Sequence, residues 1–255
     1  MAERIYIKSR REIELMRRAG RLTAQARTVA REAVRAGVTT KHIDKIVREF
    51  ITKSGGYPTF LNYGGFPGSL CISVNDEIVH GIPGRRVIRD GDIVSLDVGA
   101  TLQGFVGDCA VTAACGEVSG QAKELIEVTR QSFFEGLRFA RPGYRISDIG
   151  AAVQDYVESR GFSVVREYVG HGVGHRLHEA PDVPNYRAGT RPDPRLVKGM
   201  TIAIEPMVTA GSPEIRELSN GWTVVTADGS LAAHYENSVL ITDGEAEILT
   251  MAEDI

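Results

Sequence analysis

Five residues with metal-binding side chains lie in stretches of the sequence that otherwise read as buried strands or glycine-rich turns. They are Asp97, Asp108, His171, Glu205 and Glu236. An isolated carboxylate removed from water costs far more free energy than a domain can lose, so buried carboxylates pair with cations. Two divalent ions would neutralise four carboxylates and an imidazole that met at one place. The sequence therefore predicts a dinuclear metal site, provided that these five residues converge.

The segment around Asp97 and Asp108 reads as a β-hairpin with a turn near residues 102–104. On such a hairpin the two carboxylates lie nearly opposite each other and share a face, where cross-strand Cβ atoms are about 5 Å apart. That arrangement suits two metal ions about 3.5–4 Å apart. Taken alone, either aspartate is better explained as the end of a strand or part of a loop. Together with acids on later strands, they indicate the metal site.

His171 belongs to the segment GHGVGHRLHEAP, whose glycines allow the backbone to approach a ligand closely or to adopt a positive φ. His171 and His178 lack the four-residue spacing of a helical zinc motif. We expect His171 to bind metal and His178 to reach a substrate, and we assign no role to His175. Glu205 precedes a proline, which favours an extended backbone, and strand-like alternation follows Glu236. Singly, each glutamate is better explained as structural.

The predicted ligands also restrict the metal. Oxygen-rich ligation with one imidazole suits Mn(II), Fe(II) or Co(II), with Zn(II) as an alternative. No thiolate is needed. Cys109 directly follows Asp108, so its side chain points to the opposite face of the strand.

The composition excludes several classes of protein. The 255 residues allow one large domain or two ordinary ones, and the net charge of −3 does not indicate a nucleic-acid or anionic-membrane partner. The sequence has no apolar run of about 18 residues and no signal-peptide pattern at its start. Its three cysteines lack CxxC spacing, which favours a reducing compartment. We expect a cytoplasmic monomer that does not enter a membrane.

Hydrophobic periodicity gives the elements that must position these residues. Apolar residues at three- and four-residue spacing predict helices near 8–34, 40–54, 119–140 and 146–160. Strand patterns occur in LCISVN, DIVSLDVGA, GDCAVTAAC and SVVREYVG, and three more strands follow a proline-rich loop at 181–194. Thr39 or Thr40 is expected to cap the second helix.

The order of helices followed by strands occurs twice. The segment AGVTTKHIDKIVREFITKSGG aligns without gaps with PGYRISDIGAAVQDYVESRGF, and GDIVSLD matches GMTIAIE, which places Asp97 on Glu205. Amphipathic elements can resemble each other by chance, but unrelated segments would not keep nearly the same offset. We expect a single α+β domain over 1–255. Its two αβ halves, roughly 8–115 and 116–250, would be related by a pseudo-twofold axis, with the site between them.

The order Asp, Asp, His, Glu, Glu resembles that of the methionine aminopeptidases of the pita-bread fold. The matching motifs are HGIPG, DVGA, GFVGDCA, GHGVGHRLHEAP, IAIEPM and HYENSVLIT. The resemblance extends from about Lys8 to about Ile248 and implies central antiparallel sheets covered by helices. Because no large insertion or long N-terminal extension is present, the chain is more similar to the compact bacterial type I members than to creatinase or aminopeptidase P.

By position, the resemblance implies that two metal ions share these ligands. Asp97 would chelate one ion, and Asp108 and Glu236 would bridge both. His171 and Glu205 would hold the second ion.

The resemblance also implies contacts with the substrate. His80 would contact the scissile amide nitrogen or the substrate amine, and His178 the carbonyl oxygen. Glu205, beside a metal-bound water, is the candidate general base. The methionine pocket would be lined by Tyr63, Phe66, Cys71, Leu177 and Trp222. From the sequence alone, each of these is at least as well explained as an ordinary core residue.

The pocket departs from some family members at three positions. Some carry a second tyrosine or a phenylalanine where this chain has Phe66 and Leu177, and a histidine where it has Gly64. The resemblance therefore leaves the shape of the pocket open.

These features predict a metal-dependent aminopeptidase that removes the initiator methionine from nascent polypeptides with a small second residue, using water activated by two divalent ions. Its expected partners are the peptide substrate and, from the family alone, a transient contact with the ribosome; no nucleic-acid function is expected. Two alternatives stay open. One is a prolidase or Xaa-Pro aminopeptidase of the same fold, and the other is a non-catalytic pita-bread protein, which should lack some of the ligands.

Overall fold

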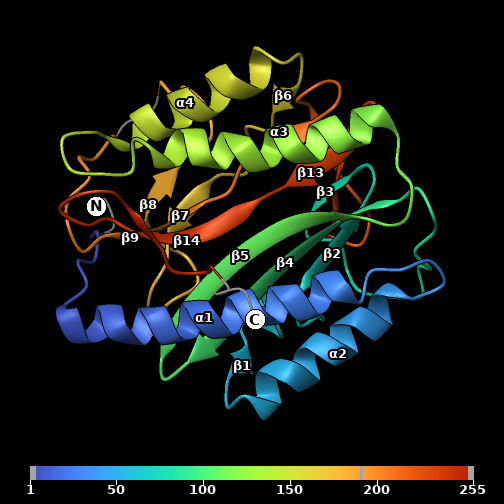
Figure 1. Cartoon of the computed structure of the whole chain (residues 1–255), viewed down its shortest axis with the longest axis horizontal. Helices are drawn as coiled ribbons and strands as arrows, with labels where there is room; N and C mark the ends of the chain where they lie inside the picture. The colour runs from blue at the N-terminus through green and yellow to red at the C-terminus, as the bar shows by residue number, and fades with distance from the viewer. Residues whose placement is uncertain (1–3, 190–191, 252–255) are drawn as a thin grey trace.

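The computed structural model describes residues 4–189 and 192–251, and its helices lie on two sides of a large antiparallel sheet (Figure 1). The helices are α1 (Arg10–Glu32), α2 (Thr40–Lys53), α3 (Gly120–Leu137) and α4 (Ile146–Glu158). In Figure 1, α1 and α2 lie below the strands, and α3 and α4 lie above them. All four predicted helices are therefore confirmed, with ends that differ by a few residues.

The central sheet has nine strands among the described residues. Its order is β1–β4–β5–β14–β9–β7–β8, with β2 paired to β4 and β15 to β14. The bounds are β1 (Tyr57–Pro58), β2 (Cys71–Val74), β4 (Ile93–Leu102), β5 (Phe105–Ala114), β7 (Gly170–Gly172), β8 (Glu179–Val183), β9 (Thr201–Ile204), β14 (Glu236–Leu240) and β15 (Glu247–Ile248). All of these pairs are antiparallel.

Two smaller sheets complete the architecture, one of order β13–β10–β6 and one of order β11–β12–β3. Their strands are β3 (Glu77–Val79), β6 (Ser163–Val164), β10 (Met207–Thr209), β11 (Ile215–Glu217), β12 (Val224–Thr226) and β13 (Ala232–His234). The predicted α+β class is confirmed. The division into halves at roughly 8–115 and 116–250 stays a prediction.

A capping box begins α1, and a glycine on β5 lets the helix pack close to the central sheet. The Ser9 hydroxyl accepts a hydrogen bond from the Glu12 backbone N–H, and the Glu12 carboxylate accepts one from the Ser9 N–H at 2.7 Å. Along the buried face, a Cβ on Gly107 of β5 would lie 2.5 Å from Oγ1 of Thr23. Glycine at this position therefore lets α1 pack directly against β5, the strand that carries Asp108.

The turn between β4 and β5 explains the predicted hairpin. Gln103 and Gly104 form a two-residue connection, and both have positive φ angles, 52° and 82°. Positive φ at both central residues is the pattern of a type I′ turn, whose twist matches that of the strands.

Three strand predictions are corrected by the structure. In the described part of the chain, seven strands, β9 to β15, follow residue 194, where three were predicted. The segment SVVREYVG forms strand only at Ser163–Val164 and again from Gly170, because the exposed Arg166 and Glu167 lie in the bend between them. The proline-rich stretch from residue 181 is not loop throughout, since β8 extends to Val183. The N-cap prediction is confirmed, because Thr39 caps α2 and accepts a hydrogen bond from His42. None of the helices within 4–189 and 192–251 is long and apolar enough to cross a bilayer.

Candidate metal centre

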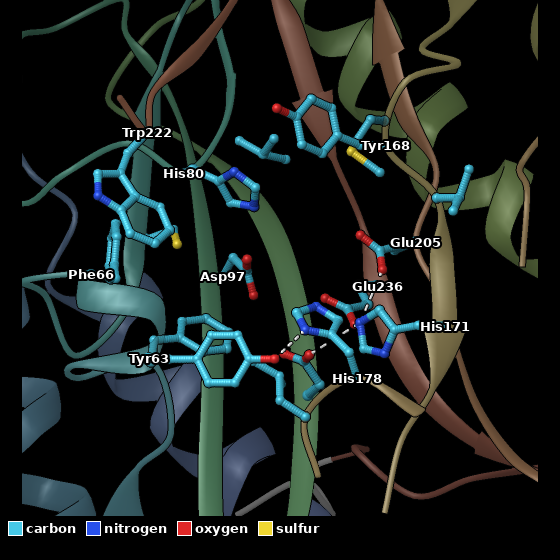
Figure 2. A pocket seen from close by; sticks show the side chains of 17 residues that line it. Tyr63, Phe66, His80, Asp97, Tyr168, His171, His178, Glu205, Trp222 and Glu236 are labelled. Atoms are coloured by element: carbon cyan, nitrogen blue, oxygen red, sulfur yellow. Dashed lines mark hydrogen bonds and ion pairs between the residues drawn. The ribbon is translucent and has the colours of Figure 1, made fainter. Parts of the chain in front are cut away.

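The five predicted ligands come from consecutive strands of the central sheet. Asp97 lies on β4, Asp108 on β5 and Glu236 on β14. Glu205 directly follows β9, and His171 lies on β7. Because β4, β5, β14, β9 and β7 are neighbours in that order, the five side chains gather along one cavity (Figure 2). The structure thus brings together the residues that the sequence analysis selected.

The two aspartates are diagonal neighbours. Asp97 is paired with Ala110, and Asp108 with Gly99, so the prediction that the aspartates lie nearly opposite each other is wrong by two residues. They still share a face, because residues two apart on a strand point the same way. Ala110 is also paired with Glu236 of β14. A small residue between two acids leaves space for ions among the carboxylates.

His171 has the hydrogen-bonding pattern of a metal ligand. Its Nδ1 lies 2.9 Å from the carbonyl oxygen of Gly172, so Nδ1–H can donate there and leave the Nε2 lone pair free. Nε2 lies 3.4 Å from Oε1 of Glu205 and 3.7 Å from Oδ2 of Asp108. The ligand atoms of Asp108, His171 and Glu236 all lie within 4.8 Å of one another. Asp97 lines the same cavity but belongs to no such close triplet within the described chain.

The carboxylates are buried without compensating partners. One oxygen each of Asp97, Asp108 and Glu236 is inaccessible to solvent and accepts no hydrogen bond from any residue that the structure describes. Burial raises the pKa of Asp97 to about 7. Burial, and then the neighbouring carboxylates, raise the pKa of Asp108, Glu205 and Glu236 well above their usual values. Divalent cations would remove this cost, so these residues fit a metal centre.

The histidines of the site are held in the neutral form that binds metals and donates hydrogen bonds. Burial lowers the pKa of His171 to about 3 and that of His80 to about 4, and it also lowers the pKa of His178. A neutral imidazole keeps one lone pair and one N–H.

One histidine of the site was missed by the sequence analysis. His234 ends β13 and is 2% exposed, and neither of its ring nitrogens has a hydrogen-bond partner among the described residues. Its Nε2 lies 3.7 Å from Oε2 of Glu205. Possible ligand atoms of Glu205, His234 and Glu236 lie within 4.8 Å of one another. The signal was its position two residues before Glu236, since strand residues two apart share a face.

An apolar cavity of about 300 Å³ opens beside the carboxylates (Figure 2). All seven side chains predicted to contact substrate line it: Tyr63, Phe66, Cys71, His80, Leu177, His178 and Trp222. The sequence analysis missed other residues that line the cavity, among them Phe60, Tyr168 and Met207. The rings of Phe66 and Trp222 pack edge to face with centroids 5.2 Å apart.

Two histidines line the same cavity as the carboxylates. Nδ1 of His178 lies 2.7 Å from the hydroxyl of Tyr63, and its ring packs against that of His171 with centroids 4.3 Å apart. His80 has φ +59°, the left-handed conformation that is uncommon outside glycine. Its ring centroid lies 5.3 Å from that of Tyr168. His175, which was assigned no role, does not line the cavity.

Comparison with known proteins identifies the family. Residues 14–243 match the model of metallopeptidase family M24. The methionine aminopeptidase of Clostridium acetobutylicum is 51% identical over 250 residues, which cover 98% of this chain and 100% of that protein. The chain belongs to the methionine aminopeptidases of family M24.

Solved structures of this family confirm the pita-bread fold. The methionine aminopeptidase of Thermotoga maritima superposes with a TM-score of 0.93 at 46% identity, over 97% of this chain and 100% of that one. The prolidase of Pyrococcus furiosus superposes with a TM-score of 0.77 at 22% identity, over 97% of this chain and 66% of that one. The likeness to prolidase concerns the fold alone, whereas the family is that of the methionine aminopeptidases.

Proposed function

We propose that this member of the family removes the initiator methionine from nascent polypeptides whose second residue is small, with water activated by two divalent ions. One observation carries the proposal. The side chains of the five predicted metal ligands, which lie on or directly after five neighbouring strands, meet at a cavity with apolar and aromatic walls.

The proposed division of the ligands between two ions follows the family resemblance. Asp97 would hold one ion, Asp108 and Glu236 would bridge two, and His171 and Glu205 would hold the second. Oxygen donors with an imidazole suit Mn(II), Fe(II), Co(II) or Zn(II). When bound, such ions lower the pKa of a coordinated water and polarise the scissile carbonyl.

A residue of the protein would carry the proton from the attacking water to the leaving amine. Glu205 faces the cavity, so its carboxylate is placed to accept a proton from the attacking water and to return it to the leaving amine. His80 faces Glu205 from the other side of the cavity in Figure 2 and is proposed to contact the amine side of the substrate.

His178 is the proposed donor to the carbonyl oxygen. If the Tyr63 hydroxyl donates to Nδ1, the ring proton resides on Nε2, which is then free to donate to the substrate. A donor placed at the developing oxyanion is typically worth about 2.7–4 kcal/mol of transition-state stabilisation. Tyr63 would thus set the tautomer of His178 in addition to lining the methionine pocket.

The walls of the cavity suit a methionine side chain. Phe66, Leu177 and Trp222 present apolar surface, and Cys71 adds a buried thiol whose pKa is raised well above its usual value by burial. A flexible, polarisable thioether packs well against aromatic rings. The neutral thiol is therefore a wall of the pocket rather than a nucleophile.

The proposal is tested by removing bound metal, adding back single divalent ions and following the cleavage of Met-Ala-Ser. We expect activity with at least one of Mn(II), Fe(II), Co(II) and Zn(II), and little cleavage of Ala-Pro-Ser. Failure of all four ions to support cleavage of Met-Ala-Ser would overturn the proposal. Preference for Ala-Pro-Ser would favour an Xaa-Pro peptidase.

Three finer expectations belong to the same proposal. We propose that the protein is a monomer, that it works in the cytoplasm and that it contacts the ribosome transiently. All three cysteines are buried and free of disulfides, which accords with a reducing compartment.

A further inference from the structure

A buried ion pair joins the segment before α1 to the first residue of β8. Nζ of Lys8 lies 2.6 Å from Oε2 of Glu179, and the side chains are only 1% and 6% exposed. The two residues are 171 positions apart in the sequence. Glu179 directly follows His178, so the pair lies next to a residue of the proposed active site.

The ion pair braces the loop at 173–178, which connects β7 to β8. Oε1 of Glu179 accepts a hydrogen bond from the backbone N–H of Arg176 at 3.1 Å. A Cβ added to Gly174 would lie 2.5 Å from Cε and 2.6 Å from Nζ of Lys8. Glycine therefore provides the space through which the lysine reaches Glu179. The backbone N–H of Lys8 donates to the carbonyl oxygen of Gly199 at 2.8 Å, which anchors the lysine to the residue that precedes β9 by two positions.

His178 is thereby held from two sides. Its side chain lines the cavity and contacts the Tyr63 hydroxyl, whereas Glu179 does not line the cavity and pairs with Lys8. Movement of the Glu179 backbone would move the adjacent imidazole directly. A buried ion pair contributes little net stability compared with apolar residues of similar size. Fixing the geometry of the adjacent loop is the role that best fits its position.

We propose that Lys8 and Glu179 are positioning residues, whose ion pair fixes the 173–178 loop so that His178 is aligned with the carbonyl oxygen of the scissile bond. The inference rests on the proposed aminopeptidase function. Because the contact of His178 strengthens as charge develops on that oxygen, loss of alignment lowers kcat more than it raises KM.

The test measures metal-loaded enzyme on Met-Ala-Ser with Lys8→Met, which keeps the length of the side chain and removes its charge. We expect kcat to fall about tenfold, less than the 10²–10³-fold loss typical of removing a donor outright. KM and bound metal should stay unchanged. Lys8→Arg, which keeps the charge, should restore most of kcat.

A double-mutant cycle with His178→Ala separates positioning from general destabilisation. In the His178→Ala background, Lys8→Met should cause almost no further loss of kcat, because the group that it positions is gone. Equal losses in both backgrounds would overturn the inference. A loss of bound metal in Lys8→Met would also overturn it, because the substitution would then act through the metal ligand His171 and not through His178.

Two further variants keep the test decisive. Lys8→Met leaves a buried carboxylate unpaired, so the double variant Lys8→Met with Glu179→Met, which buries no charge, is measured alongside. If neither folds, Glu179→Gln enters the same cycle. Arg17→Met is the control, since it breaks another ion pair of α1, in which Arg17 bonds to Glu247 of β15, and it should leave kcat unchanged.

The outcomes also distinguish this inference from the proposed function. Wild-type enzyme that does not cleave Met-Ala-Ser with any divalent ion contradicts the function. Wild-type enzyme that cleaves this peptide, with Lys8→Met and Glu179→Gln equally active, contradicts only the role of the ion pair.

Discussion

The hydroxyl of Tyr63 lies 2.7 Å from Nδ1 of His178, although the two residues are 115 positions apart in the sequence. Tyr63 belongs to a short 3₁₀ turn, η1 (Tyr63–Gly65); it is 43% exposed and lines the cavity. The sequence analysis assigned Tyr63 only to the wall of the methionine pocket. The structure adds a contact with the histidine proposed to donate to the substrate.

Replacing Tyr63 by phenylalanine tests this contact. The ring would still line the pocket, but His178 would lose the partner that favours a proton on Nε2. A single hydrogen bond of net value about 0.5–1.5 kcal/mol corresponds to a fall in kcat between about twofold and tenfold. KM for Met-Ala-Ser should change little, and steady-state kinetics measure both constants.

Tyr57→Phe is the matched control, because the Tyr57 hydroxyl donates to the carbonyl oxygen of Leu61 and does not line the cavity. Its kinetic constants should equal those of wild type. A Tyr63→Phe enzyme with raised KM and unchanged kcat would show that Tyr63 only binds the methionine side chain.

Replacing Asp97 by asparagine should remove metal and activity together. Asparagine keeps the shape of the side chain but loses the charge that binds a divalent ion. In the metal-free protein the same change removes a buried carboxylate whose pKa is raised to about 7, so it should not lower the melting temperature. Elemental analysis and thermal denaturation with and without a chelator measure the two effects. Full metal content in the variant would remove Asp97 from the ligand set.

Metal binding should also stabilise the wild-type fold. An ion present at a hundredfold excess over its dissociation constant stabilises the native state by about 2.7 kcal/mol. The melting temperature should therefore fall on chelation and recover on adding back metal. A melting temperature that does not respond to either treatment would contradict a metal centre among these carboxylates.

The sequence predicted the ligands as a set, because five metal-binding side chains lie in stretches that otherwise read as buried strands or glycine-rich turns. Asp97, for example, lies in the largely apolar stretch IVSLDVGA, and such an interruption is visible without knowledge of the fold. The predicted register of the hairpin was wrong by two residues. Asp97 would face Asp108 only across a two-residue turn at residues 102–103. The turn lies one residue later, at Gln103–Gly104, so Asp97 pairs with Ala110 and the aspartates become diagonal neighbours.

Contacts between distant segments could not be predicted in this way. The pairing of Lys8 with Glu179 joins segments that no local pattern connects. The segment SVVREYVG has the alternation of a strand, but it pairs only at its two ends: Ser163 and Val164 pair with β10, and Gly170 pairs with β8. Strand formation depends on such neighbours as much as on local propensity. His234 is a different case, because a local signal existed: it lies two residues before Glu236, and strand residues two apart share a face.

His234 should affect metal affinity. Its unpartnered Nε2 lies 3.7 Å from Glu205, so the imidazole can orient this carboxylate or share its ion. Groups that orient metal ligands typically contribute about 10–100-fold to metal affinity. We therefore expect His234→Ala to weaken metal binding by about that factor, as measured by competition with a chromophoric chelator. An unchanged dissociation constant would make His234 a packing residue only.

The capping box of α1 gives a pH dependence that is independent of the metal centre. Hydrogen bonds from Ser9, and then from the Tyr6 hydroxyl, lower the pKa of Glu12 from 4.5 to about 2, and His175 contacts the same carboxylate. A carboxylate with a depressed pKa in the folded state contributes stability above its unfolded pKa and loses it as the pH falls through the folded value. Glu12→Gln should therefore cost about 0.5–1 kcal/mol at pH 6, and this cost should shrink as the pH falls from 4.5 toward 2. Ser9→Ala should remain destabilising at both ends of that range, because a hydroxyl does not titrate there. Urea denaturation at pH 6 and pH 3 measures both variants, and an equal cost of Glu12→Gln at the two pH values would show that its charge does not stabilise the cap.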